Sequence, residues 1–204
     1  MKDMIKNALI LCTITLIAGL LLGGVYEMTL ESRTEQAEKK KNEAYAKVLN
    51  DASSFEEKDT DDFSKYYNIL NEYDITKKNV VIDGIAMGYD NNKELVGFVV
   101  SVTSKEGFGG DISFTVGVKM DGTVSGVSIL SISETAGLGM NATQDEFLNQ
   151  YLISGDGLFV VNKEDGADGI NIDALTGATI TSKAMTKGVN SAIIVARELI
   201  KEVE

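Results

Sequence analysis

The sequence predicts an α+β protein, in which a single N-terminal transmembrane helix is followed by an antiparallel sheet packed with helices. Three features support this fold class: an uncharged apolar run near the N-terminus, alternating apolar runs joined by turn residues in the middle, and an amphipathic run at the end. The length of 204 residues suits one compact domain with an appendage and excludes two large domains.

The N-terminal apolar run is long enough to cross a bilayer. As a helix, the residues from Ala8 to Tyr26 would extend about 28 Å, which matches the hydrocarbon core. A cleaved signal peptide would have a shorter apolar region and a small-residue cleavage site after it, so we expect a retained single-pass anchor. Lys2 and Lys6 precede the run and Glu27 follows it. This charge distribution places the N-terminus in the cytoplasm, the apolar run in the cell (inner) membrane and the remainder on the extracytoplasmic side.

Two helices are expected between the apolar run and the sheet. Residues 27–50 are rich in Glu, Lys, Ala and Gln and contain no Gly or Pro, which favours a polar helix acting as a stalk or an outer-face helix. A second helix is expected over residues 61–73. Its apolar positions recur at helical spacing: Phe63, Tyr66, Tyr67 and Leu70.

The middle of the chain predicts at least four antiparallel strands. The run that begins at Val80 and the run over residues 94–104 are separated by the turn-forming residues 90–92, which predicts a hairpin. Residues 112–120 alternate strictly between apolar and other residues, and Asp121-Gly122 separates them from a further run over residues 123–133. Asp-Gly between two such runs is a strong hairpin signal. We expect helices to cover one face of this sheet.

Two helical segments are expected after the sheet. Residues 143–152 predict a helix with Thr143 as its N-cap and with Phe147 and Leu148 facing inward. Residues 181–203 carry an apolar stripe and predict a long packed helix. The predicted organisation is a cytoplasmic N-terminus (1–7), a transmembrane helix (8–26), a stalk with outer helices (27–78) and a folded domain (79–204).

The composition excludes several kinds of chemistry. The chain has no His, which removes imidazole bases, His-based catalytic triads and His-ligated metal sites. Its one Cys, Cys12, cannot form an internal disulfide, a four-Cys zinc site or a Cys-held iron–sulfur cluster. The net charge of −12 argues against sequence-independent nucleic-acid binding. We therefore predict no catalytic residue and no metal ligand, and a redox role would need an organic cofactor or an intermolecular ligand.

Two segments rich in small residues could carry chemistry. Residues 173–179 (DALTGAT) precede the final helix, where unpaired amides and the helix dipole favour an anion such as phosphate. An ordinary Ser/Thr-rich N-cap has the same composition. Residues 133–140 (SETAGLGM) follow the last strand, and the glycines around Leu138 permit a backbone against which a flat ring could lie, as well as a plain connecting loop. A third segment, residues 107–110 (GFGG), resembles a dinucleotide fingerprint only superficially, because it precedes a strand.

Together and in this order, these segments resemble the FMN-binding domain family, found in the G subunit of Rnf electron-transport complexes and in the C subunit of sodium-pumping NADH:quinone reductase. The family's attachment motif has the form D-x-x-[ST]-G-A-[ST], which residues 173–179 match. The family's E-T-P-G-L-G loop corresponds to residues 134–139, with Ala136 in place of the proline. Because the chain contains no proline at all, a general avoidance explains this replacement. The resemblance covers roughly residues 80–200, and the N-terminal anchor fits it.

The resemblance implies FMN bound covalently through a phosphoester to Thr179. It assigns cofactor binding to four further residues of the motif and to five residues of the loop: Asp173, Thr176, Gly177 and Ala178, and Glu134, Thr135, Gly137, Leu138 and Gly139. It also implies two kinds of partner, a flavin transferase that uses FAD and magnesium during maturation, and the other membrane subunits of an Rnf complex.

The function that the resemblance implies is electron transfer through FMN in a membrane-bound, ion-translocating ferredoxin:NAD oxidoreductase. The chain would be an electron-transfer subunit that is not catalytic alone. Two alternatives remain at this point. One is the C subunit of the sodium-pumping NADH:quinone reductase, although this chain is short for that protein. The other is a flavin-free, membrane-anchored binding module, which lacks the fluorescence of a covalent flavin.

Overall fold

The computed structural model describes residues 2–58, 62–152, 157–161 and 168–203. The chain divides into two compact units, residues 1–41 and residues 42–204. The first unit consists of most of helix α1 (Lys2–Val48). By length and composition, α1 contains a stretch that could cross a membrane, and none of that stretch is buried against other parts of the chain.

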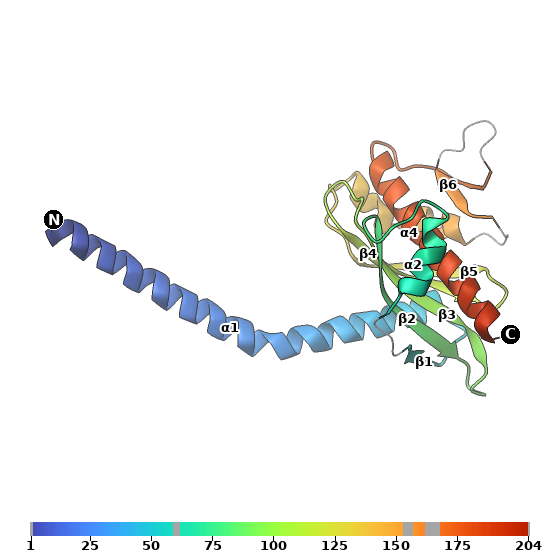
Figure 1. The fold of residues 1–204 in the computed structure, drawn as a ribbon, viewed down its shortest axis with the longest axis horizontal. Coiled ribbons are helices and arrows are strands. Elements are labelled where there is room, and N and C mark those ends of the chain that lie inside the picture. Colours follow the sequence, from blue (N-terminus) through green and yellow to red (C-terminus); the bar gives the residue numbers. More distant parts are fainter. Residues whose placement is uncertain (1, 59–61, 153–156, 162–167, 204) are drawn as a thin grey trace. The chain divides into compact units, whose positions relative to one another are not determined.

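The second unit is built on a five-stranded antiparallel sheet whose strands follow one another in chain order (Figure 1). The strands are β1 (Ser54–Glu57), β2 (Val80–Tyr89), β3 (Leu95–Ser104), β4 (Ile112–Lys119) and β5 (Val124–Ser131). Both predicted hairpins are confirmed, β2 with β3 and β4 with β5. In the second hairpin, Gly122 has a φ of +81°, a conformation that glycine adopts without strain.

Helix α4 (Thr179–Val203) lies along one face of the sheet (Figure 1). Its apolar stripe packs against the apolar residues of the central strands, as the sequence predicts. The largest fully buried side chains of this core include Phe98, Phe114, Ile112, Met185 and Ile193.

Helix α2 (Ser64–Asn71) packs beside the C-terminal part of α4, where Lys65 forms an ion pair with Glu202 at 2.6 Å. It is shorter than the helix predicted over 61–73, because the chain turns after it and Asp74 takes a φ of +57°. Residue 61 lies outside the described residues.

The segment after β5 is less regular than the single helix predicted for 143–152. It contains the 3₁₀ turn η1 (Gly139–Thr143), the short helix α3 (Asp145–Leu148) and a second 3₁₀ turn, η2 (Asn149–Tyr151). The prediction of Thr143 as an N-cap is wrong: Gln144 occupies that position, and the Thr143 hydroxyl donates to the Met140 carbonyl at 2.9 Å. Phe147 and Leu148 are buried, as predicted.

Two short strands that the sequence does not predict, β6 (Phe159–Val161) and β7 (Ile170–Ile172), pair in parallel, and β6 lies beside α4 (Figure 1).

Helices cover both faces of the sheet, so the prediction that they cover one face is wrong. The second face is covered by the end of α1, residues 42–48, which belongs to the second unit. Tyr45, Val48 and Leu49 are buried there, packed with Ala86 of β2 and Val99 of β3. These three apolar residues stand at positions i, i+3 and i+4 at the end of a polar helix, a pattern too short to distinguish a packed turn from an exposed stalk.

Two glycines allow this close approach of the helix end to the sheet. Gly117 of β4 and Gly126 of β5 lie opposite each other in the pairing of the two strands. A Cβ on Gly126 would stand 2.6 Å from Val48 Cα, and a Cβ on Gly117 would overlap the Val48 carbonyl oxygen. The Ser125 hydroxyl donates a hydrogen bond to that carbonyl. The end of α1 therefore packs directly on the backbone of the sheet.

Candidate functional site

The segment that ends in Thr179 forms a tight turn directly before α4. Gly177 has a φ of +74°, and the Ala178 N–H donates to the Leu175 carbonyl at 2.9 Å. The Leu175 N–H in turn donates to the Ser182 hydroxyl at 2.9 Å. As a result α4 begins at Thr179, two residues earlier than predicted. The first amide groups of a helix lack acceptors within the helix, and the helix dipole is positive there, so an anion is favoured beside Thr179.

A cavity of about 370 Å³ opens beside Thr179. Its volume falls in the range of roughly 300–1,000 Å³ that is typical of small-molecule sites. Three segments line it: Phe108; Glu134, Thr135, Leu138 and Gly139; and Gly177, Ala178, Thr179, Ile180 and Thr181. The fold thus brings together the two segments that the sequence singles out, residues 133–140 and 173–179.

Large apolar side chains stand exposed around this cavity. Phe108 is 71% exposed, Ile180 is 53% exposed and Leu138 is 43% exposed. A cluster of exposed apolar side chains commonly marks a binding site. The cavity therefore combines an apolar surface suited to a flat ring, a helix end suited to an anion and the exposed hydroxyl residue Thr179.

Three of the sequence-predicted residues do not line the cavity, namely Asp173, Thr176 and Gly137. Asp173 is held by Gln150, whose Oε1 accepts the Asp173 N–H at 2.7 Å. Asp173 and Thr176 are exposed in the turn before α4. Their exposure makes them accessible to an enzyme that acts on this segment. A ligand in the cavity would contact the lining residues instead.

Phe108 and Ile180 line the cavity but are not among the sequence-predicted site residues. Phe108 stands in the loop between β3 and β4 with glycine on both sides, outside the alternation that buries apolar residues in a strand. Ile180 stands in the first turn of α4 and is exposed, unlike the buried stripe of that helix. An apolar residue that fits neither periodicity is the signal that identifies both.

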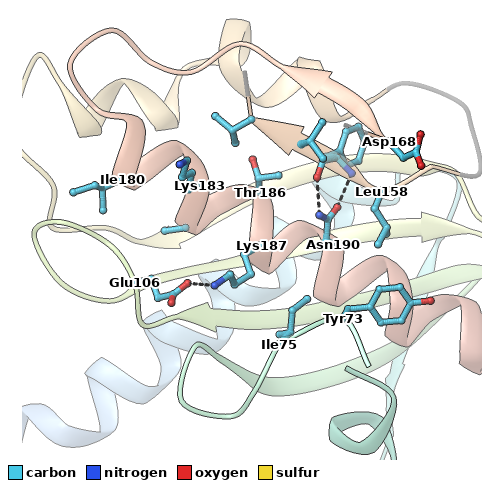
Figure 2. Close-up of a pocket in the computed structure, with 14 residues that line it drawn as sticks. Tyr73, Ile75, Glu106, Leu158, Asp168, Ile180, Lys183, Thr186, Lys187 and Asn190 are labelled. Carbon is cyan, nitrogen blue, oxygen red and sulfur yellow. Dashed lines mark hydrogen bonds and ion pairs between the residues drawn. The ribbon is translucent and has the colours of Figure 1, made fainter. Parts of the chain in front are cut away.

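A second and larger cavity, of about 710 Å³, lies between α4, β6 and the segment that contains Tyr73 (Figure 2). Ile180 lines this cavity too, but Thr179 does not. Lys187 pairs there with Glu106 at 2.6 Å and holds the pKa of that carboxyl below its usual value. The Asn190 amide bonds both backbone groups of Phe159. Since these polar groups are engaged with the protein itself, the smaller cavity is the better candidate site.

Comparison with known protein families identifies an FMN-binding domain over residues 107–194, which includes both segments at the smaller cavity. The chain is 35% identical to the G subunit of the proton-translocating ferredoxin:NAD(+) oxidoreductase complex of Clostridium ljungdahlii, over 92% of this chain and 87% of the relative. It is 32% identical to the G subunit of the Na(+)-translocating ferredoxin:NAD(+) oxidoreductase complex of Acetobacterium woodii, over 96% of this chain and 88% of the relative.

Among solved structures, the fold resembles the C subunit of the Na(+)-translocating NADH-quinone reductase from Parabacteroides distasonis. The TM-score is 0.54 at 16% identity, and the match covers 84% of this chain and 96% of that chain. This likeness concerns the fold, whereas the identity to the G subunits extends along nearly the whole sequence. The chain therefore belongs to the family of G subunits of ion-translocating oxidoreductase complexes.

Proposed function

We propose that this chain is the electron-carrying subunit of a membrane-bound, ion-translocating ferredoxin:NAD oxidoreductase complex, with FMN bound covalently to Thr179. Family membership and the FMN-binding domain support the first part of the proposal. One observation carries the second: Thr179 is an exposed hydroxyl residue at the start of α4, on the edge of a cavity whose apolar side chains are exposed. Bound FMN would supply the one-electron and two-electron chemistry of its ring.

Attachment requires an activated donor of FMN, because a threonine hydroxyl does not condense unaided with a phosphate monoester in water. We assign this step to a flavin transferase that uses FAD and magnesium. The Thr179 oxygen would bond to the phosphorus on the FMN side of the FAD pyrophosphate, the bond from that phosphorus to the bridging oxygen would break, and AMP would leave as the hydroxyl loses its proton. The chain thereby gains the mass of FMN less one water.

The residues around Thr179 have separate roles in this proposal. The amides of the first turn of α4 offset the negative charge of the phosphoester. Phe108, Leu138 and Ile180 supply the apolar surface that packs on the ring and excludes water from it. Because the phosphoester is remote from the ring, the bond to Thr179 acts as a tether, and the packing residues set the reduction potential.

Leu138→Ala tests the role of the packing residues. We expect the covalent yield of FMN to stay unchanged, because Leu138 is not part of the turn before α4. Water then reaches the ring more freely and stabilises the reduced form, which carries more negative charge, so the midpoint potential should rise. A rise of about 30 mV corresponds to about 1.4 kcal/mol for a two-electron couple. Spectroelectrochemical titration of the purified chain measures this shift, and an unchanged potential would remove Leu138 from the site.

The proposal itself is tested by the fluorescence of the denatured chain. The full chain is expressed with and without a flavin transferase, denatured and separated on a gel under ultraviolet light. A fluorescent band is expected only with the transferase. A dark band in its presence would contradict covalent attachment and would favour a flavin-free binding module.

We further propose that α1 crosses the membrane once, with the N-terminus in the cytoplasm and the second unit outside. The charge distribution around the apolar run supports this orientation. In a Cys12→Ala background, Lys201→Cys should react with a membrane-impermeant maleimide on intact spheroplasts. Lys2→Cys should react only after permeabilisation. The opposite pattern would reverse the orientation.

A further inference from the structure

We propose that Glu134 is a positioning residue that holds the loop carrying Phe108 against the loop carrying Leu138, and so sets the width of the cavity beside Thr179. This inference rests on the proposed function, since the cavity is taken to hold the flavin ring. Glu134 would act by binding the backbone of the loop that carries Phe108, in addition to lining the cavity.

The carboxyl group of Glu134 is enclosed between glycines of two loops. Glu134 is 8% exposed, and its Oε1 accepts a hydrogen bond from the Gly109 N–H at 3.2 Å. A Cβ placed on Gly107 would lie 2.9 Å from Oε1, and a Cβ placed on Gly139 would lie 2.6 Å from Oε2. One oxygen therefore faces the loop between β3 and β4, and the other faces the start of η1.

Each of these loops carries one apolar wall of the cavity. Phe108 lies between Gly107 and Gly109, and Leu138 directly precedes Gly139. Phe108 is itself largely exposed, so its own side chain adds little packing to hold its loop in place. The hydrogen bond from the Gly109 N–H to Glu134 Oε1 provides that restraint, and it depends on the side chain being long enough to reach this amide.

Two substitutions separate the reach of the side chain from its charge. Glu134→Gln keeps the length and an oxygen that can accept the Gly109 N–H, but removes the charge. Glu134→Asp keeps the charge but draws the oxygens back by one methylene. Glu106→Asp, at the larger cavity, is the matched control. Each full chain is coexpressed with the flavin transferase, and iodide quenching of flavin fluorescence measures access to the ring.

We expect iodide to quench the flavin fluorescence of Glu134→Gln and of the control as much as that of the chain without substitutions. Glu134→Asp should raise the population of chains with an open cavity about tenfold. A tenfold change in this equilibrium corresponds to about 1.4 kcal/mol. Equal quenching in Glu134→Asp and the unmodified sequence would overturn the proposal. An effect of Glu134→Gln as large as that of Glu134→Asp would also overturn it, because charge would then be responsible.

Two further measurements keep the test independent of folding and of the proposed function. Covalent FMN is determined by intact mass in every sample, and absence of FMN from the chain without substitutions contradicts the proposed function and not the role of Glu134. Amide hydrogen exchange on the full chain without substitutions measures the protection of the Gly109 N–H directly, even if Glu134→Asp does not fold. Slow exchange of this amide is expected in spite of its exposed loop, and exchange at the rate of a free loop would overturn the proposal.

Discussion

Thr179→Ala is expected to abolish covalent FMN while leaving the fold intact. The substitution removes the one hydroxyl that the proposed phosphoester needs. Thr179 is exposed and is the first residue of α4, so the cost in unfolding free energy should stay below about 1 kcal/mol. Gel fluorescence of the denatured chain, coexpressed with a flavin transferase, measures the loss, and circular dichroism of the same sample checks the fold.

Thr176→Ala is the matched control, because it removes an exposed threonine from the same turn. It should retain at least part of the flavin. Asp173→Ala should reduce modification without removing the acceptor, since Asp173 lies in the exposed segment that the transferase would recognise. A folded Thr179→Ala chain that still fluoresces after denaturation would show that another residue carries the flavin.

Gly126→Ala is expected to cause the largest loss of stability among the changes considered. Its Cβ would stand 2.6 Å from Val48 Cα, and the main chain of α1 cannot yield as a flexible side chain would. Overpacking of this kind costs about 3 kcal/mol at the upper end of its usual range. For a chain of this size, the unfolding midpoint should fall by about 6–12 °C. Calorimetry of the detergent-solubilised full chain measures the change.

Gly84→Ala is the control for this experiment. Gly84 lies in β2 of the same sheet, and apart from its chain neighbours no heavy atom of the described residues stands within 4 Å of a Cβ placed there. Its midpoint should be unchanged or slightly raised, because alanine reduces the freedom of the unfolded chain. If Gly126→Ala unfolds at the same temperature as Gly84→Ala, the packing of the α1 end on the sheet does not depend on the close approach of Val48 to Gly126.

The sequence predicts β2 to β5 well because their signals are local. Strict alternation over β4 and the Asp121-Gly122 turn define a hairpin without knowledge of the rest of the fold. The long apolar stripe of α4 is equally clear. Elements of three or four residues, β1, β6 and β7, carry too little pattern to be recognised and depend on pairing with neighbours for their conformation.

Contacts between distant segments are what the sequence leaves open. The packing of the α1 end depends on Gly117 and Gly126, about 70–80 residues further along the chain than Val48. The site shows the same limit. The resemblance points to Thr179 and Leu138, whereas Phe108 joins them only because the fold brings the loop between β3 and β4 to the start of α4.

The most direct test of the covalent assignment is to locate the flavin on the chain without amino-acid substitutions. Trypsin should release residues 164–183, which contain Thr176, Thr179, Thr181 and Ser182 as possible acceptors. Tandem mass spectrometry of this peptide, from a chain matured with a flavin transferase, should place the mass of FMN less one water on Thr179. The same mass on one of the other three hydroxyls, or an unmodified peptide, would contradict the account.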